Sequence, residues 1–104
     1  MLIFVDRQRS EVRECDDLKR LSVVVEEGAE NEDIARALVP LGTLDSPAHA
    51  WVSIDRLRAA CGRDGDAGWS EAFDVMVRFA ASNGWLDGTG SRLRAHLVRH
   101  PASG

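Results

Sequence analysis

Three stretches of the chain carry apolar residues at the spacing of an α-helix, and glycine or proline closes the first of them. The apolar residues of 34–41 recur at i, i+3, i+4 and i+7, which places them on one helix face. Asn31 is a good N-cap for this segment, and Pro40 with Gly42 ends it, because the residue before a proline avoids the helical conformation. The spacing therefore predicts a first helix that begins at Asn31.

The second and third helical stretches follow the same rule. Ser53 is the predicted cap of the second helix and Gly62 its end, while the third runs from 69 to 83. The third helix should be the most buried, with an inward stripe of Trp69, Phe73, Met76 and Ala80 that Val75 and Phe79 widen.

Residues 1–28 are instead rich in strand signals. The segments 2–5, 11–15 and 21–25 predict a three-stranded meander or a hairpin plus one strand, and the middle strand alternates poorly. The remaining connection 43–50 is predicted as a loop.

Later strands are shorter. Trp51 and Val52 are predicted as a very short strand that leads into the second helix. Residues 85–86 and 92–98 form a predicted hairpin around the glycine turn 87–90, and the tail 99–104 is expected to be frayed.

The element order from residue 31 onward resembles the winged helix-turn-helix superfamily. Residues 34–41 match its first helix, 51–52 its first strand, 53–57 its second helix, 69–83 its third helix, and 85–98 its winged hairpin. The resemblance implies an α+β fold: an N-terminal β-hairpin or meander (1–28) followed by a winged-helix-like three-helix core with a C-terminal hairpin (31–98). We expect a single domain over 1–104, whose N-terminal strands extend the sheet of the wing or form a pairing surface.

The resemblance also implies that the third helix enters the DNA major groove while the wing contacts phosphates. That helix carries Glu71, Asp74 and Arg78, a net negative set on the element that would approach phosphate. The final strand favours the opposite interpretation, because Arg92, Arg94 and His96 alternate onto one face and His100 follows them. Candidate contacts for a phosphate or an acidic partner are Arg92, Arg94, His96 and Arg99; the alternative is a solvated sheet face.

Each tryptophan lies at a predicted element boundary. Trp51, Trp69 and Trp85 are either core residues at the rims of the helical layer or a shared apolar cleft or oligomer contact. His49 is the histidine nearest the middle of the fold, and a structural or surface role is the alternative to a general base. Cys15 and Cys61 match no metal-binding or redox motif and are expected to be half-buried free thiols in a reducing cytoplasm.

Charge and composition narrow the function classes. The net charge of the chain is -4, and the acidity belongs to residues 1–50, whereas 51–104 sum to +1. Almost all basic residues are arginine, a usage that resembles uncharacterised proteins of high-GC bacteria. We expect no membrane segment and no secretory signal, and nothing in the sequence indicates a cofactor, a metal site or a catalytic set.

Three functions remain as hypotheses. The first is a non-enzymatic cytoplasmic module that binds a protein partner or a second copy of itself, as a homodimer. The second is a DNA-binding regulator that uses the wing, and the third is a ligand binder or small enzyme with a cleft near His49.

Overall fold

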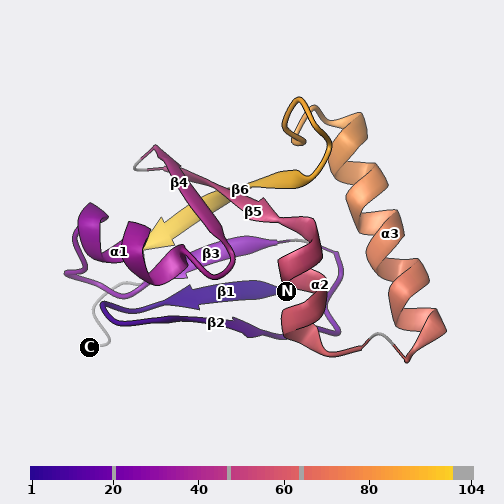
Figure 1. Cartoon of the computed structure of the whole chain (residues 1–104), viewed down its shortest axis with the longest axis horizontal. Coiled ribbons are helices and arrows are strands. Elements are labelled where there is room, and N and C mark those ends of the chain that lie inside the picture. Colours follow the sequence, from indigo (N-terminus) through magenta and orange to yellow (C-terminus); the bar gives the residue numbers. More distant parts are fainter. Residues whose placement is uncertain (20, 47, 64, 100–104) are drawn as a thin grey trace.

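The computed structural model describes residues 1–19, 21–46, 48–63 and 65–99 (Figure 1). The described strands form one mixed sheet in the order β2-β1-β3-β6-β5-β4. The strands are β1 (Leu2–Val5), β2 (Ser10–Arg13), β3 (Ser22–Val25), β4 (Gly42–Ser46), β5 (His49–Ser53) and β6 (Arg92–Arg99). The helices are α1 (Asn31–Leu38), α2 (Ile54–Cys61) and α3 (Ala67–Ser82). The predicted α+β class is confirmed.

Two antiparallel units join in the middle of this sheet. β1 pairs with β2 and β5 pairs with β4, both antiparallel, and β6 pairs antiparallel with β5. The parallel pairs β1–β3 and β3–β6 connect the N-terminal strands to the rest. The three predicted N-terminal strands are confirmed, and they lengthen the same sheet that contains β6.

Strand alternation gives the sheet one buried face and one open face. The buried face carries Ile3, Val5, Val23 and Val25, each fully inaccessible, together with Ala50 of β5. Ile34 and Leu38 of α1 and Leu57 of α2 belong to the same core, so these two helices cover that face. The open face carries the alternate residues, among them Phe4, Val24 and Val98, which the strand register places side by side.

Local capping chemistry sets the helix boundaries. The Ser53 hydroxyl accepts a hydrogen bond from Arg56 N at 3.3 Å, and α2 ends at Gly62 in the left-handed conformation, both as predicted. α3 begins earlier than predicted, because the Asp66 carboxylate caps it by accepting from Trp69 N at 3.0 Å. In α1 the capping position belongs to Glu30, so the prediction of Asn31 as the N-cap is wrong by one residue.

The predicted loop 43–50 is wrong: this segment contains most of β4 and the start of β5, which pair antiparallel. Gly42 makes the pairing possible, because a Cβ at this position would lie 1.9 Å from the Trp51 carbonyl oxygen. The short strand predicted at 51–52 is therefore the centre of a longer one. The predicted strand 85–86 is reduced to a single bridge between Leu86 and Leu93.

The glycine turn before β6 is confirmed, and Asp87 organises it. Its carboxylate accepts hydrogen bonds from the Thr89 hydroxyl, from the backbone N of Ser91 and Arg92, and from Arg92 Nε at 2.8 Å. Arg92, and then the turn's backbone and hydroxyl donors, hold the pKa of Asp87 far below its ordinary value. The expected frayed tail 99–104 and His100 lie outside the described residues, apart from Arg99, which ends β6.

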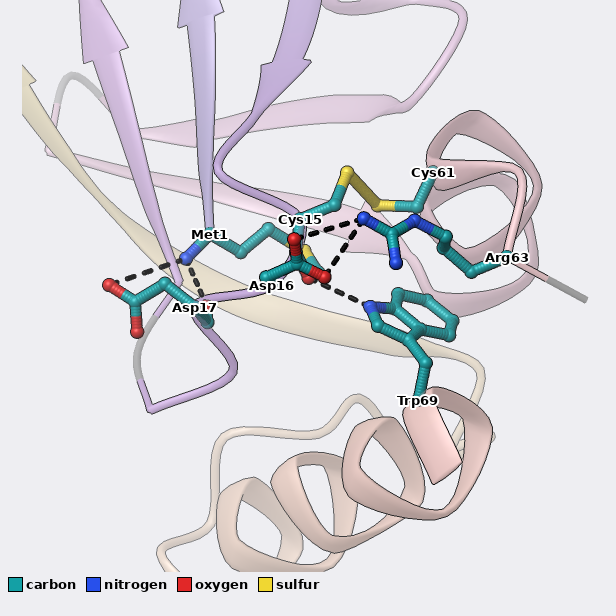
Figure 2. The surroundings of a disulfide bond; sticks show 7 residues. All are labelled: Met1, Cys15, Asp16, Asp17, Cys61, Arg63 and Trp69. Carbon is teal, nitrogen blue, oxygen red and sulfur yellow. Dashed lines mark hydrogen bonds and ion pairs between the residues drawn. A yellow bond between two sulfur atoms is a disulfide. The ribbon is translucent and has the colours of Figure 1, made fainter. Parts of the chain in front are cut away.

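The prediction of two free thiols is wrong, because Cys15 and Cys61 form a disulfide with a Cα–Cα distance of 5.9 Å (Figure 2). The bond joins the β2–β3 connection to the last residue of α2. Residues beside it reinforce the junction: Trp69 Nε1 donates to the Cys15 carbonyl at 2.8 Å, and Arg63 pairs with Asp16 at 2.9 Å.

The N-terminus is held at the same junction. The Met1 ammonium donates to the Asp17 carbonyl, and the Met1 side chain is buried (Figure 2). The β2–β3 connection is thus fastened to β1, α2 and α3.

Helix α3 packs across the end of the sheet at which β1, β3 and β6 begin (Figure 1). Its predicted stripe of Trp69, Phe73, Met76 and Ala80 is buried. The expectation that Val75 and Phe79 widen this stripe is wrong, since they are 51% and 57% exposed. The buried residues of α3 therefore lie on one side of the helix, and Val75 and Phe79 lie outside it. Within the described residues, no helix combines the length and apolarity that crossing a membrane requires.

Candidate functional site

Two adjoining concavities lie where the C-terminal half of α3 meets the starts of β3 and β6. The first, here named the α3 groove, has a volume of about 210 Å³ and is lined by Lys19, Leu21, Met76, Phe79, Ala80, Trp85, Leu93 and Arg94. The second, the His pocket, has a volume of about 300 Å³ and is lined by Leu21, His49, Trp85, Arg94 and His96. Leu21, Trp85 and Arg94 line both, so the two form one continuous depression.

An aromatic pair forms the outer wall of the α3 groove. The rings of Phe79 and Trp85 meet edge to face, with centroids 5.9 Å apart and planes at 76°. Phe79 is 57% exposed and Trp85 is 45% exposed. Two large aromatic side chains therefore contact each other edge to face and still expose about half of their surface to solvent.

The chain path after α3 fixes the position of Trp85. Gly84 takes a positive φ of 74°, and the chain turns back so that Trp85 N donates to the Ala80 carbonyl at 2.9 Å. The Trp85 carbonyl in turn accepts from Arg94 N at 2.7 Å. These backbone bonds tie the tryptophan to both α3 and β6 and preorganise the groove wall.

The register of β5 on β6 builds the His pocket on the open face of the sheet. His49 lies directly opposite His96, and their rings meet edge to face with centroids 4.6 Å apart. Arg94 Nη2 lies 3.5 Å from His49 Nδ1 and 3.4 Å from the Asp45 carboxylate on β4. One guanidinium and two imidazoles therefore face the same concavity.

The electrostatic environment of His49 disfavours its protonated form. Desolvation, and then the nearby Arg94 and His96, lower the pKa of His49, while Asp45 acts in the opposite direction. Arg94 and His96 together therefore affect the pKa of His49 more strongly than the single carboxylate does.

The predicted basic residues do not form one continuous strip. Arg92 pairs with Asp87 at 2.8 Å, and Arg99, at the far end of β6, donates to the Ala29 carbonyl and the Asn31 side chain. Arg94 and His96 remain together and face the His pocket. His100 is outside the described residues.

The structure separates the three tryptophans. Trp69 is 6% exposed and stacks on Phe73 beside the disulfide, so it is a core residue. Trp51 lies on the open face of β5, opposite Arg94 and beneath the Arg92 guanidinium at 5.8 Å. Trp85 alone of the three lines the two concavities.

Several lining residues escaped the sequence prediction. Lys19 and Leu21 come from the β2–β3 connection, roughly sixty positions before Phe79, so no local pattern joins them. The sequence did contain one signal that Phe79 is exposed. Four residues of α3 already fill its inner face, so Phe79 is not needed to complete that face. Among the residues that the structure describes, no group of three or more His, Cys, Asp or Glu side chains could hold a metal ion.

Comparison with known proteins identified no relative of the chain. No protein-family model matches the chain, and neither the curated proteins nor the solved structures contain a significant match.

Proposed function

We propose that the protein is a non-enzymatic protein-interaction module on a winged-helix-like core, and that it binds an acidic peptide segment of a partner in the α3 groove. The observation that carries the proposal is the exposed Phe79–Trp85 pair at the wall of a groove that Lys19 and Arg94 also line. The order α1, β5, α2, α3, β6 follows the expected order of that core, with β4 added before β5 and a single bridge in place of the first strand of the wing.

The apolar part of the groove suits a buried side chain of the partner. Met76, Ala80, Leu93 and Leu21 form its floor and sides, and aromatic residues in such a setting are the usual anchors of an interface. Covering the exposed half of Phe79 would contribute about 1–2 kcal/mol, which is roughly a 5- to 30-fold change in affinity. A peptide with one apolar anchor therefore gains measurable affinity from this ring alone.

The charged side chains of the α3 groove determine which peptides it favours. Among the residues that the structure describes, the lining of the groove includes two cations and no acidic side chain. A partner segment with Asp or Glu beside its apolar anchor complements them, whereas a basic segment is repelled. The acidity of residues 1–50 does not oppose this, because it lies outside the groove lining.

The two other hypotheses have less support. Contact of α3 with DNA would bring Glu71 and Asp74 toward phosphate, and Asp74 is already paired with Arg58 at 2.6 Å. A small enzyme needs a nucleophile or an acid–base pair beside its cleft, and the lining of the two concavities offers His49 and His96 without a carboxylate partner of their own.

A random-peptide display selection against the folded protein tests the proposal. We expect enrichment of peptides that carry acidic residues around one apolar or aromatic residue. Calorimetry with a selected peptide should show at least a 5-fold loss of affinity for Phe79→Ser. Val75→Ser is the matched control, because Val75 is 51% exposed on the same helix and does not line the groove.

Three results would contradict the proposal: no enriched peptide, enrichment without acidic residues, or equal binding by the Phe79→Ser variant. Light scattering over a concentration series completes the test. A dimer that Phe79→Ser dissociates would assign the groove to a second copy of the chain and overturn the peptide interpretation.

A further inference from the structure

We infer that the His pocket binds the phosphate group of a phosphate monoester, with Arg94, His49 and His96 as the groups that recognise it. The inference shares Arg94 and Trp85 with the peptide proposal, but it adds the open-face histidines of β5 and β6, which do not line the α3 groove.

The arrangement of donors is the first support. Arg94 Nη2 contacts both the His49 ring and the Asp45 carboxylate. The Arg94 side chain remains 43% exposed, so it is accessible to an incoming anion, and a guanidinium forms charge-assisted hydrogen bonds to phosphate oxygens. The imidazoles of His49 and His96 stand beside it on the same sheet face.

The balance of charge is the second support. The charged or titratable groups that face His49 are Arg94 and His96 from β6 and Asp45 from β4; the other lining residues, Leu21 and Trp85, are neutral. Asp45 offsets one positive charge, that of Arg94. Arg94 and His96 act on His49 in the same direction and outweigh Asp45, and a monoester that carries close to two negative charges near neutral pH complements this side of the pocket.

The size of the pocket is the third support. About 300 Å³ leaves room for an organic substituent next to the phosphate. Leu21 and the exposed Trp85 ring provide an apolar wall for that substituent. An aryl phosphate therefore fits the lining better than inorganic phosphate does.

NMR titration of the folded protein with phenyl phosphate is the direct test. We expect saturable shifts of the His49 and His96 ring signals. The pKa of His49 should rise by about one unit when the ligand is bound, because a group that binds the anion about ten-fold better when protonated is stabilised in that form. Benzoate, which has the same ring and a single negative charge, should bind at least about ten-fold more weakly.

Variants locate the site. Arg94→Gln should lower the affinity for phenyl phosphate about ten-fold or more, and His49→Asn should weaken the dependence of affinity on pH, leaving the part that comes from the second ionisation of the ligand. Arg78→Gln is the matched control, because it removes one exposed arginine of α3 that lines neither concavity. Phenyl phosphate titration and peptide selection are separate measurements, so the failure of this inference and the failure of the peptide proposal give different results.

A further arm distinguishes the source of the phosphate. A phosphotyrosine peptide that binds at least about ten-fold more tightly than phenyl phosphate, with the gain lost in Phe79→Ser, assigns the phosphate to a protein partner. Equal affinities assign it to a small molecule. The inference is overturned if phenyl phosphate does not saturate, if benzoate binds equally well, or if Arg94→Gln binds like the native chain.

Discussion

Removal of the Cys15–Cys61 disulfide should lower the stability of the protein substantially. The two cysteines are 46 positions apart, and a cross-link over a loop of that length removes chain entropy from the unfolded state. The loop-closure relation gives about 4 kcal/mol at 25 °C for such a loop. The free energy of unfolding of a small domain is only about 5–15 kcal/mol, so the loss leaves a marginally stable chain.

Urea unfolding, followed by circular dichroism and tryptophan fluorescence, measures this effect. The Cys15→Ser/Cys61→Ser double variant and the reduced native chain should both lose about 4 kcal/mol relative to the oxidised protein. Trp69 is a local reporter, because its indole donates to the Cys15 carbonyl. Arg63→Gln is the control: it removes the neighbouring pair with Asp16, a partly exposed ion pair worth about 1 kcal/mol or less.

Two results would refute the reasoning. One is a double variant that unfolds within about 1 kcal/mol of the oxidised protein, since the entropy of a loop this long would then not contribute to stability. The other is a thiol titration of the purified, natively folded chain that finds both cysteines reactive, which would show that the cross-link is not formed.

Two further predictions concern the turn before β6 and the β4–β5 hairpin. Asp87→Asn should have a lower urea midpoint than the unsubstituted protein at pH 7, and the two midpoints should converge in acid. Folding lowers the pKa of Asp87 below 3.8, so its carboxylate stabilises the fold above that pH. This stabilisation declines as the pH falls toward the folded-state pKa. A difference in urea midpoint between the two proteins that stays constant from pH 7 to about pH 2 would contradict the prediction. Gly42→Ala should cost about 2–3 kcal/mol, because its Cβ would meet the Trp51 carbonyl, whereas Gly88→Ala, with open space around it, should be nearly neutral in thermal unfolding. Equal melting temperatures for the two glycine variants would show that the hairpin tolerates the added methyl group.

Local patterns predicted the regular elements well. β1 and β3 follow from β-branched apolar runs, and α2 follows from the Ser53 cap, the apolar spacing and Gly62. These features act over a few residues, so the sequence contains all that is needed to recognise them. The β4–β5 hairpin was missed because its first strand reads Gly-Thr-Leu-Asp-Ser, a composition typical of a loop.

The candidate sites depend on contacts that the sequence does not display. His49 was a candidate residue, but its neighbour His96 is 47 positions away and reaches it only through the β5–β6 register. Trp85 was also a candidate residue. Its ring packs against Phe79 in the structure, but the sequence analysis placed Phe79 in the core. An exposed aromatic side chain and a buried one have the same helical spacing, and only the width of the surface beneath the helix separates them.

The sequence by itself determined the α+β class, the two ends of α2, the glycine turn and the alternation of Arg94 and His96 on one face of β6. Each of these depends on hydrogen bonds and side-chain geometry within a few residues. The tertiary structure decided the disulfide, the open face of the sheet and the composition of the α3 groove and the His pocket. These depend on which strands pair and on how far α3 reaches over the sheet end, and the packing energy of the whole chain selects both.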